Sequence, residues 1–191
     1  MDFDSVPVEI WNRTQLIYVC SPGNPSGKVM SLDQWQKIFE LSDLYGFVIA
    51  ADECYSEIYF DEAHPPLGAL QAAHLLGRSY KNLIVFSSLS KRSNVPGMRS
   101  GFVAGDEAII EKFTLYRTYH GCAMNPAVQA ASIAAWNDEA HVIENRKQYA
   151  AKFKDVTPLL TDVLEAVIPD AAFYLWAKIK DNNISDTDLA I

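Results

Sequence analysis

The sequence predicts an α/β fold, a three-layer sandwich in which helices cover a mostly parallel sheet. Short apolar runs that do not alternate with polar residues recur at Leu16–Cys20, Phe47–Ala51, Leu83–Phe86 and Phe102–Ala104. Longer segments with helical periodicity separate the early runs and fill the second half of the chain. Continuous apolar strands separated by helices are typical of a buried, mostly parallel sheet, because helices cover both of its faces.

The first strand–helix–strand passage carries clear local signals. The apolar run Leu16–Cys20 breaks into a loop rich in proline and glycine, residues 21–28. The helix that follows has a capping box, with Ser31 as its N-cap and Gln34 three residues later. Gly46 suits its C-terminal end, because glycine readily adopts the left-handed conformation that closes many helices.

The second half of the chain is predicted to be mainly helical. The patterns indicate helices over residues 107–116, 127–136 and 139 to about 167, the last of them kinked or interrupted at Pro158. After Pro169, the run Phe173–Trp176 reads as a strand that begins a new unit.

The composition is that of a globular protein with an acidic surface. Of the 191 residues, 49% are hydrophobic, and the net charge of −8 argues against a nucleic-acid-binding surface. No apolar stretch approaches the length of a membrane span, and the first residues do not form a secretory signal. Cys20, Cys54 and Cys122 lack metal-ligand spacing. We therefore expect a cytoplasmic protein with reduced cysteines and with no nucleic-acid or membrane partner.

Polar residues of unusual kinds lie where the predicted strands end. They are Asn24, Asp52 with Tyr55, the stretch Ser87–Lys91, and Arg99. In open parallel sheets, ligands bind beyond the carboxyl ends of the strands. Taken singly, such residues could be a helix cap, a surface ion pair, a solvated lysine or a turn residue. Their combination and order favour a binding site.

Two familiar motifs are disfavoured. A P-loop needs four residues between its glycines and Ser or Thr after the lysine. Here three residues separate Gly23 from Gly27, and Val29 follows Lys28. The stretch Ser88–Lys91 matches the S-x-x-K motif of penicillin-binding proteins and β-lactamases, but those enzymes also need S-D-N and K-T-G tripeptides, and neither occurs in the sequence.

The order of the strand-end motifs resembles the class I/II aminotransferases of fold type I, enzymes that use pyridoxal 5′-phosphate. The matching parts are Asn24-Pro25-Ser26-Gly27, Asp52-Glu53-Cys54-Tyr55 and Ser88-Leu89-Ser90-Lys91, then Arg99 eight residues after the lysine, and Gly101. The lysine segment is the most specific part, and the resemblance runs through nearly the whole chain. One departure is Ser100, where the family usually has an aliphatic residue, and we expect it to affect packing more than chemistry.

The resemblance implies a catalytic role for Lys91. This lysine would hold the cofactor as a Schiff base and then act as general base and acid, because a primary amine is the nucleophile that forms such a bond. Asp52 would pair with the protonated pyridine nitrogen and keep the ring an electron sink.

The resemblance also implies how the rest of the cofactor is held. Asn24 and Tyr55 would donate hydrogen bonds to its phenolic oxygen. Ser88 and Arg99 would take its phosphate, Arg99 through a charge-assisted fork. No metal is implied.

The family's organisation implies three parts. Residues 1–140 would be the later part of the cofactor-binding large domain, residues 141–168 a long interdomain helix, and residues 169–191 the start of a small α+β domain. Because family members are much longer, the chain looks like a fragment, and we expect the fragment alone to be inactive. The ring-stacking aromatic residue and the arginine that grips the substrate carboxylate would lie outside it.

Within the family, the runs Ala51–Asp61 and Ser87–Gly105 look most like the bacterial N-succinyldiaminopimelate aminotransferases of lysine biosynthesis. The expected substrates are therefore an amino acid and a 2-oxo acid, namely N-succinyl-LL-2,6-diaminopimelate and 2-oxoglutarate, with glutamate as the amino donor in the biosynthetic direction. Two alternatives stay open: a pyridoxal-phosphate lyase of the same fold, and a non-catalytic regulatory domain that keeps the fold.

The resemblance further implies a homodimer with shared sites. The segment Tyr119–Asn125 lies where the family reaches into the partner subunit's site. Arg117 is close to this segment, and His120 within it reads as a polar loop residue.

Overall fold

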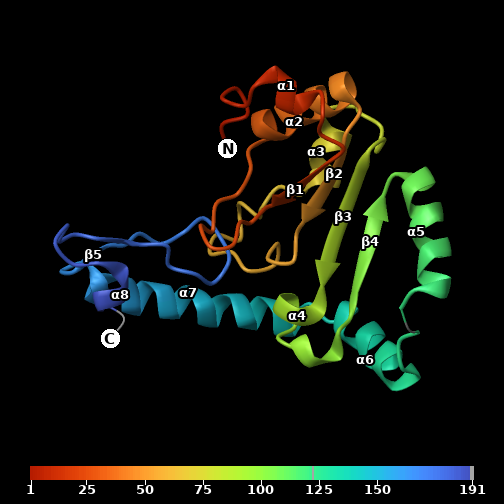
Figure 1. The fold of residues 1–191 in the computed structure, drawn as a ribbon. Helices are drawn as coiled ribbons and strands as arrows, with labels where there is room; N and C mark the ends of the chain where they lie inside the picture. The colour runs from red at the N-terminus through yellow and green to blue at the C-terminus, as the bar shows by residue number, and fades with distance from the viewer. Residues whose placement is uncertain (122, 190–191) are drawn as a thin grey trace.

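The computed structural model describes residues 1–121 and 123–189, which form a layered α/β body followed by a long helix and an irregular C-terminal part (Figure 1). The elements of the layered body are α1 (Val8–Trp11), β1 (Leu16–Cys20), α2 (Leu32–Tyr45), β2 (Val48–Asp52), α3 (Ala69–Leu75), β3 (Leu83–Ser88), α4 (Leu89–Arg92), the 3₁₀ helix η1 (Pro96–Met98), β4 (Gly101–Gly105) and α5 (Glu107–Tyr119). The remaining elements are α6 (Pro126–Trp136), α7 (Ala140–Leu160), β5 (Leu164–Glu165), β6 (Lys178–Ile179) and α8 (Asp186–Leu189).

The predicted mostly parallel sheet is confirmed. The strands lie in the order β1-β2-β3-β4, with β1, β2 and β3 parallel and β4 antiparallel to β3. The register places Cys20 of β1 beside Asp52 of β2, and Asp52 beside Phe86 of β3. The carboxyl ends of the three parallel strands therefore meet at one edge, where the strand-end residues were expected to gather.

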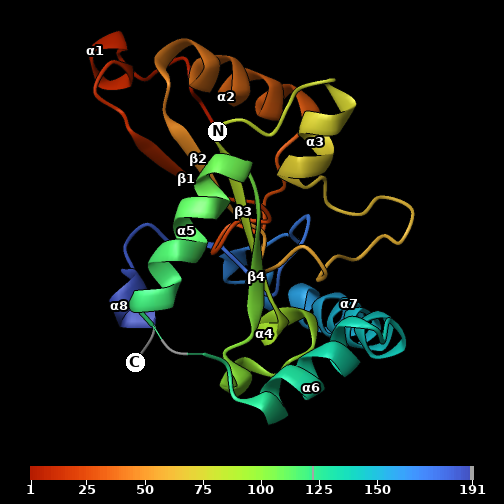
Figure 2. The ribbon, with the colours of Figure 1, turned by 90° about the vertical axis from the view of Figure 1, so that its right-hand side faces the viewer.

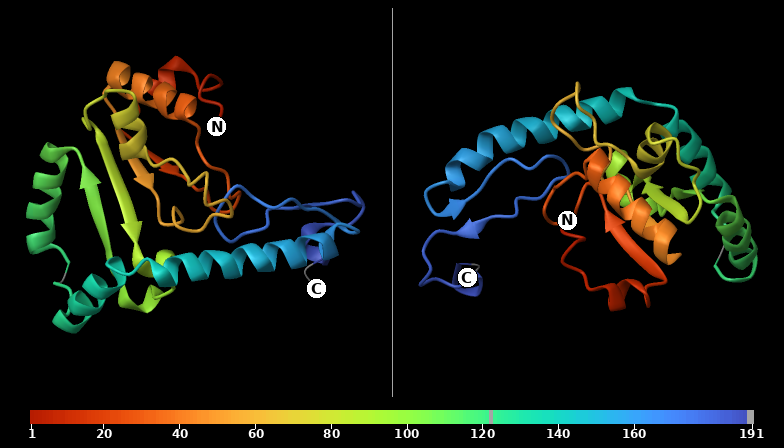
Figure 3. Two further views of the ribbon diagram at one scale, coloured as in Figure 1. Left: turned by 180° about the vertical axis from the view of Figure 1, so that it is seen from behind. Right: turned by 90° about the horizontal axis from the view of Figure 1, so that it is seen from above.

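Helices lie on both sides of this sheet, as the three-layer prediction requires. Figures 2 and 3 show α5 on one side and α2 with α3 on the other. The main core lies under α2, where Trp35, Ile38 and Phe39 are buried against strand residues such as Ile49. Burying one side chain of this size stabilises the fold by about 1.5–3 kcal/mol.

The predicted capping signals of α2 are confirmed. The Ser31 hydroxyl accepts from the Gln34 N–H at 3.3 Å, and the Gln34 side chain accepts from the Ser31 N–H at 3.0 Å. Gly46 ends the helix in the left-handed conformation, with φ of 81°. These caps fix where α2 begins and ends, and so where β2 can start.

Two buried arginines attach the long helix region to the layered body. Arg146 of α7 donates to Glu62 at 2.9 Å and to Glu57 at 3.2 Å, and its guanidinium lies 4.4 Å from the centre of the Tyr59 ring. At the N-terminal end of α7, Arg92 of α4 pairs with the carboxylate of Glu139, the residue that precedes the helix. In these pairs the guanidinium is buried while the carboxylate partner is partly or largely exposed, and α7 lies across the carboxyl ends of the strands (Figure 1).

Two sequence-based predictions about the C-terminal part are wrong. The helix predicted to reach about Val167 ends at Leu160, where Thr161 donates from its hydroxyl to the Pro158 carbonyl at 2.7 Å. The run Phe173–Trp176 is not a strand: Phe173 and Tyr174 pack on Tyr55, Trp176 is exposed, and the next strand begins at Lys178. The division of the chain into three parts stays a prediction, and its last two residues lie outside the described ones.

In the part of the chain that the structure describes, every helix is too short or too polar to cross a membrane. Cys20 and Cys54 are free thiols, and the prediction for Cys122 lies outside the described residues.

Candidate active site

The loop that carries Asn24 is closed by its own backbone. The Gly23 N–H donates to the Lys28 carbonyl at 2.9 Å, and the Gly27 N–H donates to the Gly23 carbonyl at 2.7 Å. This closed loop presents Asn24 at the surface, and the Asn24 amide donates to the Tyr55 hydroxyl at 3.5 Å. The two residues expected to share one ligand oxygen are therefore neighbours.

The segment after β2 turns tightly around Asp52. The Asp52 carboxylate accepts from the Cys54 N–H at 3.0 Å, and Tyr55 is buried. Burial raises the pKa of the Cys54 thiol to about 11, with the neighbouring Asp52 carboxylate as a further cause. Burial also raises the pKa of Glu53 to about 6. At neutral pH, Cys54 is therefore a neutral thiol that follows the acidic residues Asp52 and Glu53.

The residues predicted to take the phosphate and the covalent bond share one cavity. Its volume is about 370 Å³, and Ser88, Lys91 and Arg99 line it, together with Cys54, Ser90, Ser100 and Gly101. Ser88 ends β3 and caps α4, because its hydroxyl accepts from the Ser90 N–H at 3.1 Å. This cap turns the chain from strand to helix, so that Lys91 follows directly at the carboxyl end of β3.

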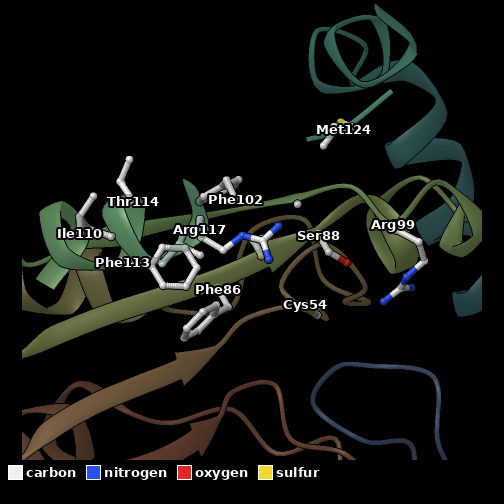
Figure 4. Close-up of a pocket in the computed structure, with 13 residues that line it drawn as sticks. Cys54, Phe86, Ser88, Arg99, Phe102, Ile110, Phe113, Thr114, Arg117 and Met124 are labelled. Carbon is white, nitrogen blue, oxygen red and sulfur yellow. The ribbon is translucent and has the colours of Figure 1, made fainter. Parts of the chain in front are cut away.

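A second cavity of about 510 Å³ adjoins the first and shares Cys54, Ser88 and Arg99 with it. Figure 4 shows Ser88 and Cys54 in the middle of this second cavity and Arg99 at one end. Phe86 and Phe113 lie towards the other end, and the Arg117 guanidinium lies between Phe113 and Ser88. Arg117, noted in the sequence only for its position near residues 119–125, thus adds a second cation to the wall. The His120 carbonyl accepts from it at 3.4 Å.

Lys91 connects the two groups of predicted residues. Lys91 lines the cavity with Ser88 and Arg99, and its amine lies 5.9 Å from the centre of the Tyr55 ring, whose hydroxyl contacts Asn24. Asp52 is bonded to the backbone of Cys54, which lines the same cavity. The structure therefore brings the predicted residues to one end of the sheet.

The donor set fits a phosphorylated aldehyde cofactor. One wall offers a primary amine, and the same cavity offers hydroxyls and a guanidinium, groups that bind phosphate through charge-assisted hydrogen bonds. A carboxylate at the end of the neighbouring strand supplies a negative charge for a protonated ring nitrogen.

Sequence reasoning missed two site residues, Phe173 and Tyr174. The Tyr174 hydroxyl lies 2.7 Å from the Tyr55 hydroxyl, and the centre of the Phe173 ring lies 5.5 Å from the Lys91 amine. The signal for them in the sequence is the aromatic pair after Pro169, and its composition predicts the beginning of a strand instead of site residues.

Ser100, the departure from the family pattern, is buried between β4 and α6. The Ser132 and Ser100 hydroxyls lie 2.8 Å apart, within hydrogen-bond distance. Ser100 also lines the Lys91 cavity. That its effect falls on packing more than on chemistry stays a prediction.

Comparison with solved structures agrees with this geometry. An aminotransferase from Neisseria meningitidis is 60% identical, with a TM-score of 0.89 over 93% of this chain and 45% of that chain. A probable N-succinyldiaminopimelate aminotransferase from Thermus thermophilus is 21% identical, with a TM-score of 0.86 over 95% of this chain and 48% of that one, and it supports the fold alone.

The family assignment comes from the sequence comparisons. The LL-diaminopimelate aminotransferase of Aquifex aeolicus is 31% identical over an alignment of length 191, which covers 96% of this chain and 47% of that protein. The chain thus spans about half the length of the curated relatives it matches. The family model for aminotransferase class I and II matches residues 1–191. The chain belongs to the class I and II aminotransferases.

Proposed function

We propose that the complete protein containing this chain transfers an amino group between an amino acid and a 2-oxo acid, with pyridoxal 5′-phosphate as its cofactor. The observation that carries the proposal is the placement of Lys91 in one cavity with Ser88 and Arg99, beside the ring of Tyr55. Class I and II aminotransferases depend on this cofactor. When bound, it supplies an aldehyde that captures amino groups and a ring that withdraws electrons from them.

Each residue of the site has a distinct task in this proposal. Lys91 would hold the aldehyde carbon of the cofactor and would also move the proton at the substrate's α-carbon. Asp52 keeps the ring nitrogen protonated by its negative charge. Ser88 and Arg99 anchor the phosphate and so fix the distance between the ring and Lys91.

The remaining pair addresses the ring oxygen. Asn24 has two amide hydrogens, so it can contact Tyr55 with one and a ligand oxygen with the other. Tyr55 donates its single hydroxyl hydrogen to the same ligand oxygen. Both contacts stabilise negative charge at that atom.

We further propose that the substrates are N-succinyl-LL-2,6-diaminopimelate and 2-oxoglutarate, in lysine biosynthesis. Support comes from the resemblance of the runs Ala51–Asp61 and Ser87–Gly105 to N-succinyldiaminopimelate aminotransferases, and from curated relatives named LL-diaminopimelate aminotransferase. The complete protein is proposed to act in the cytoplasm as a homodimer. Residues 1–140 would belong to its large domain, and residues 169–191 to its small domain.

The test measures glutamate formed by the complete protein from 2-oxoglutarate and either N-succinyl-LL-2,6-diaminopimelate or LL-2,6-diaminopimelate. The two donors differ only in the succinyl group, so the comparison isolates that group. We expect glutamate with the succinylated donor and much less with the free one. The reverse preference would contradict the narrower substrate. Consumption of the donor without 2-oxoglutarate would indicate a lyase, and no reaction with any amino acid would contradict transamination.

A further inference from the structure

The segment that carries Phe173 and Tyr174 is fixed to the loop that carries Asn24. The Ala171 N–H donates to the Gly27 carbonyl at 2.9 Å, and the Ala172 N–H donates to the Ile58 carbonyl at 2.8 Å. Ala171 and Ala172 are fully buried. Backbone hydrogen bonds therefore hold Ala171 and Ala172 to residues more than a hundred positions earlier in the chain.

A side-chain contact secures the same junction. The Asp170 carboxylate accepts from the Lys28 amine at 3.1 Å and from the Val29 N–H at 3.4 Å. Gly27 permits the close approach: it has φ of 65°, and a Cβ there would lie 2.4 Å from Pro169 Cβ. The position of Tyr174 thus depends on the loop that also positions Asn24.

This junction places two aromatic rings beside the Lys91 amine, which lies 5.5 Å from the centre of the Phe173 ring and 5.9 Å from the centre of the Tyr55 ring. The rings of Phe173 and Tyr174 meet the Tyr55 ring at centre-to-centre distances of 5.4 and 5.6 Å, both edge-on. Tyr149 of α7 stacks on the Phe173 ring, with 5.5 Å between the two ring centres. Edge-to-face packing of this kind restricts each ring to one orientation.

The contact between the two phenols is the part with chemical consequence. The hydroxyls of Tyr55 and Tyr174 lie 2.7 Å apart, a normal distance for an O–H···O hydrogen bond. A phenol oxygen can accept two hydrogen bonds but has one hydrogen to donate. If Tyr174 and Asn24 both donate to the Tyr55 oxygen, the Tyr55 hydrogen is left for a third acceptor.

We propose that Tyr174 is a positioning residue that donates to the Tyr55 oxygen and thereby directs the Tyr55 hydrogen at the oxygen of a ligand bound beside Lys91. The ligand's identity rests on the proposed function, whereas the hydroxyl pair itself does not. A donated hydrogen bond also makes the Tyr55 hydroxyl a stronger donor, because hydrogen bonds in a chain polarise one another.

The first experiment tests the hydroxyl pair in the cofactor-free complete protein. With tyrosine labelled at ¹³Cζ, Tyr174→Phe should move the Tyr55 resonance at neutral pH and leave that of the exposed Tyr18 in place. Tyr149→Phe, which removes a hydroxyl from the same aromatic cluster, should leave the Tyr55 resonance unchanged. An unmoved Tyr55 resonance in Tyr174→Phe would overturn the proposal, whatever the enzyme's reaction proves to be.

The second experiment measures the affinity of the complete protein for pyridoxal 5′-phosphate in Tyr174→Phe, Tyr55→Phe and the double variant. Loss of one hydrogen bond should weaken binding by about two- to tenfold in Tyr174→Phe. In the Tyr55→Phe background the same change should have almost no effect, because its target is gone. Equal effects in both backgrounds would show that Tyr174 acts independently of Tyr55 and would overturn the proposal.

A third variant tests the junction. Gly27→Ala should reproduce the Tyr174→Phe shift of the Tyr55 resonance, since the added methyl collides with Pro169 and displaces the segment. Gly77→Ala is the matched control, because Gly77 has the same φ of 65° and open space where a Cβ would stand. A shift of equal size in both variants would mean that backbone strain alone moves Tyr55, and the junction would then have no part in positioning it. If wild-type protein binds no pyridoxal phosphate at all, the proposed function fails while the resonance measurements still decide on Tyr174.

Discussion

The carboxyl group of Glu53, next to Asp52 in the sequence, makes the stability of the fold depend on pH. Burial raises the pKa of Glu53 from 4.5 to about 6, although the Ala69 N–H donates to this carboxyl at 2.6 Å. A group whose pKa is raised by folding stabilises the fold below its unfolded pKa, and this contribution is lost as the pH rises through the folded pKa. At 1.36 kcal/mol per pKa unit, the loss amounts to about 2 kcal/mol between about pH 4 and pH 7.

Glu53→Gln should remove this pH dependence, because glutamine still accepts from the Ala69 N–H but cannot ionise. The assay is urea unfolding of the complete protein at several pH values and a fixed protein concentration. The stability of the variant relative to wild type should improve by about 2 kcal/mol as the pH rises through this range. Glu111→Gln, on the exposed surface of α5, controls for the loss of one negative charge. Parallel stability curves for wild type and Glu53→Gln would refute the reasoning.

Three further substitutions test the site and its support. Asp52→Ala should lower the turnover number far more than the affinity for pyridoxal 5′-phosphate, because its charge matters most as the carbanion forms, and equal losses in steady-state rate and cofactor titration would contradict this role. Arg99→Ala should weaken cofactor affinity by about tenfold or more through the loss of charge-assisted hydrogen bonds, and an unchanged affinity by absorbance titration would remove Arg99 from the phosphate site. Ser100→Ala should cost about 1 kcal/mol of stability while leaving turnover intact, since Ser132 keeps its bond to the Val128 carbonyl at 2.6 Å; a large fall in turnover would show that Ser100 serves the chemistry.

The elements with strong local signals could be predicted from the sequence. The continuous apolar run Leu16–Cys20 became strand β1, although Leu16 and Tyr18 of this edge strand are exposed, and the capping box at Ser31 set the start of α2. Both signals depend on neighbouring residues only. The strand-end positions of the site residues followed from the parallel topology, because such strands end at a common edge.

The C-terminal part could not be predicted in the same way. Apolar residues such as Val163 and Val167 continue a helical pattern beyond Leu160, yet both are exposed. The aromatic pair Phe173 and Tyr174 has strand-forming composition, but its rings pack on Tyr55, more than a hundred residues earlier in the chain. Contacts of this kind leave no periodic pattern in the sequence, and so Tyr174 was missed as a site residue.

Lys91 is proposed to be the residue that bonds to the cofactor. The direct measurement is reduction of the complete protein with borohydride in the presence of pyridoxal 5′-phosphate, followed by mass spectrometry of its peptides. We expect the reduced cofactor on Lys91, and we expect Lys91→Ala to lose both the adduct and transamination. Lys28 is the informative competitor, because it is exposed and belongs to the loop that carries Asn24. A cofactor adduct on Lys28 or any other lysine of the wild-type protein, with Lys91 unmodified, would contradict the account.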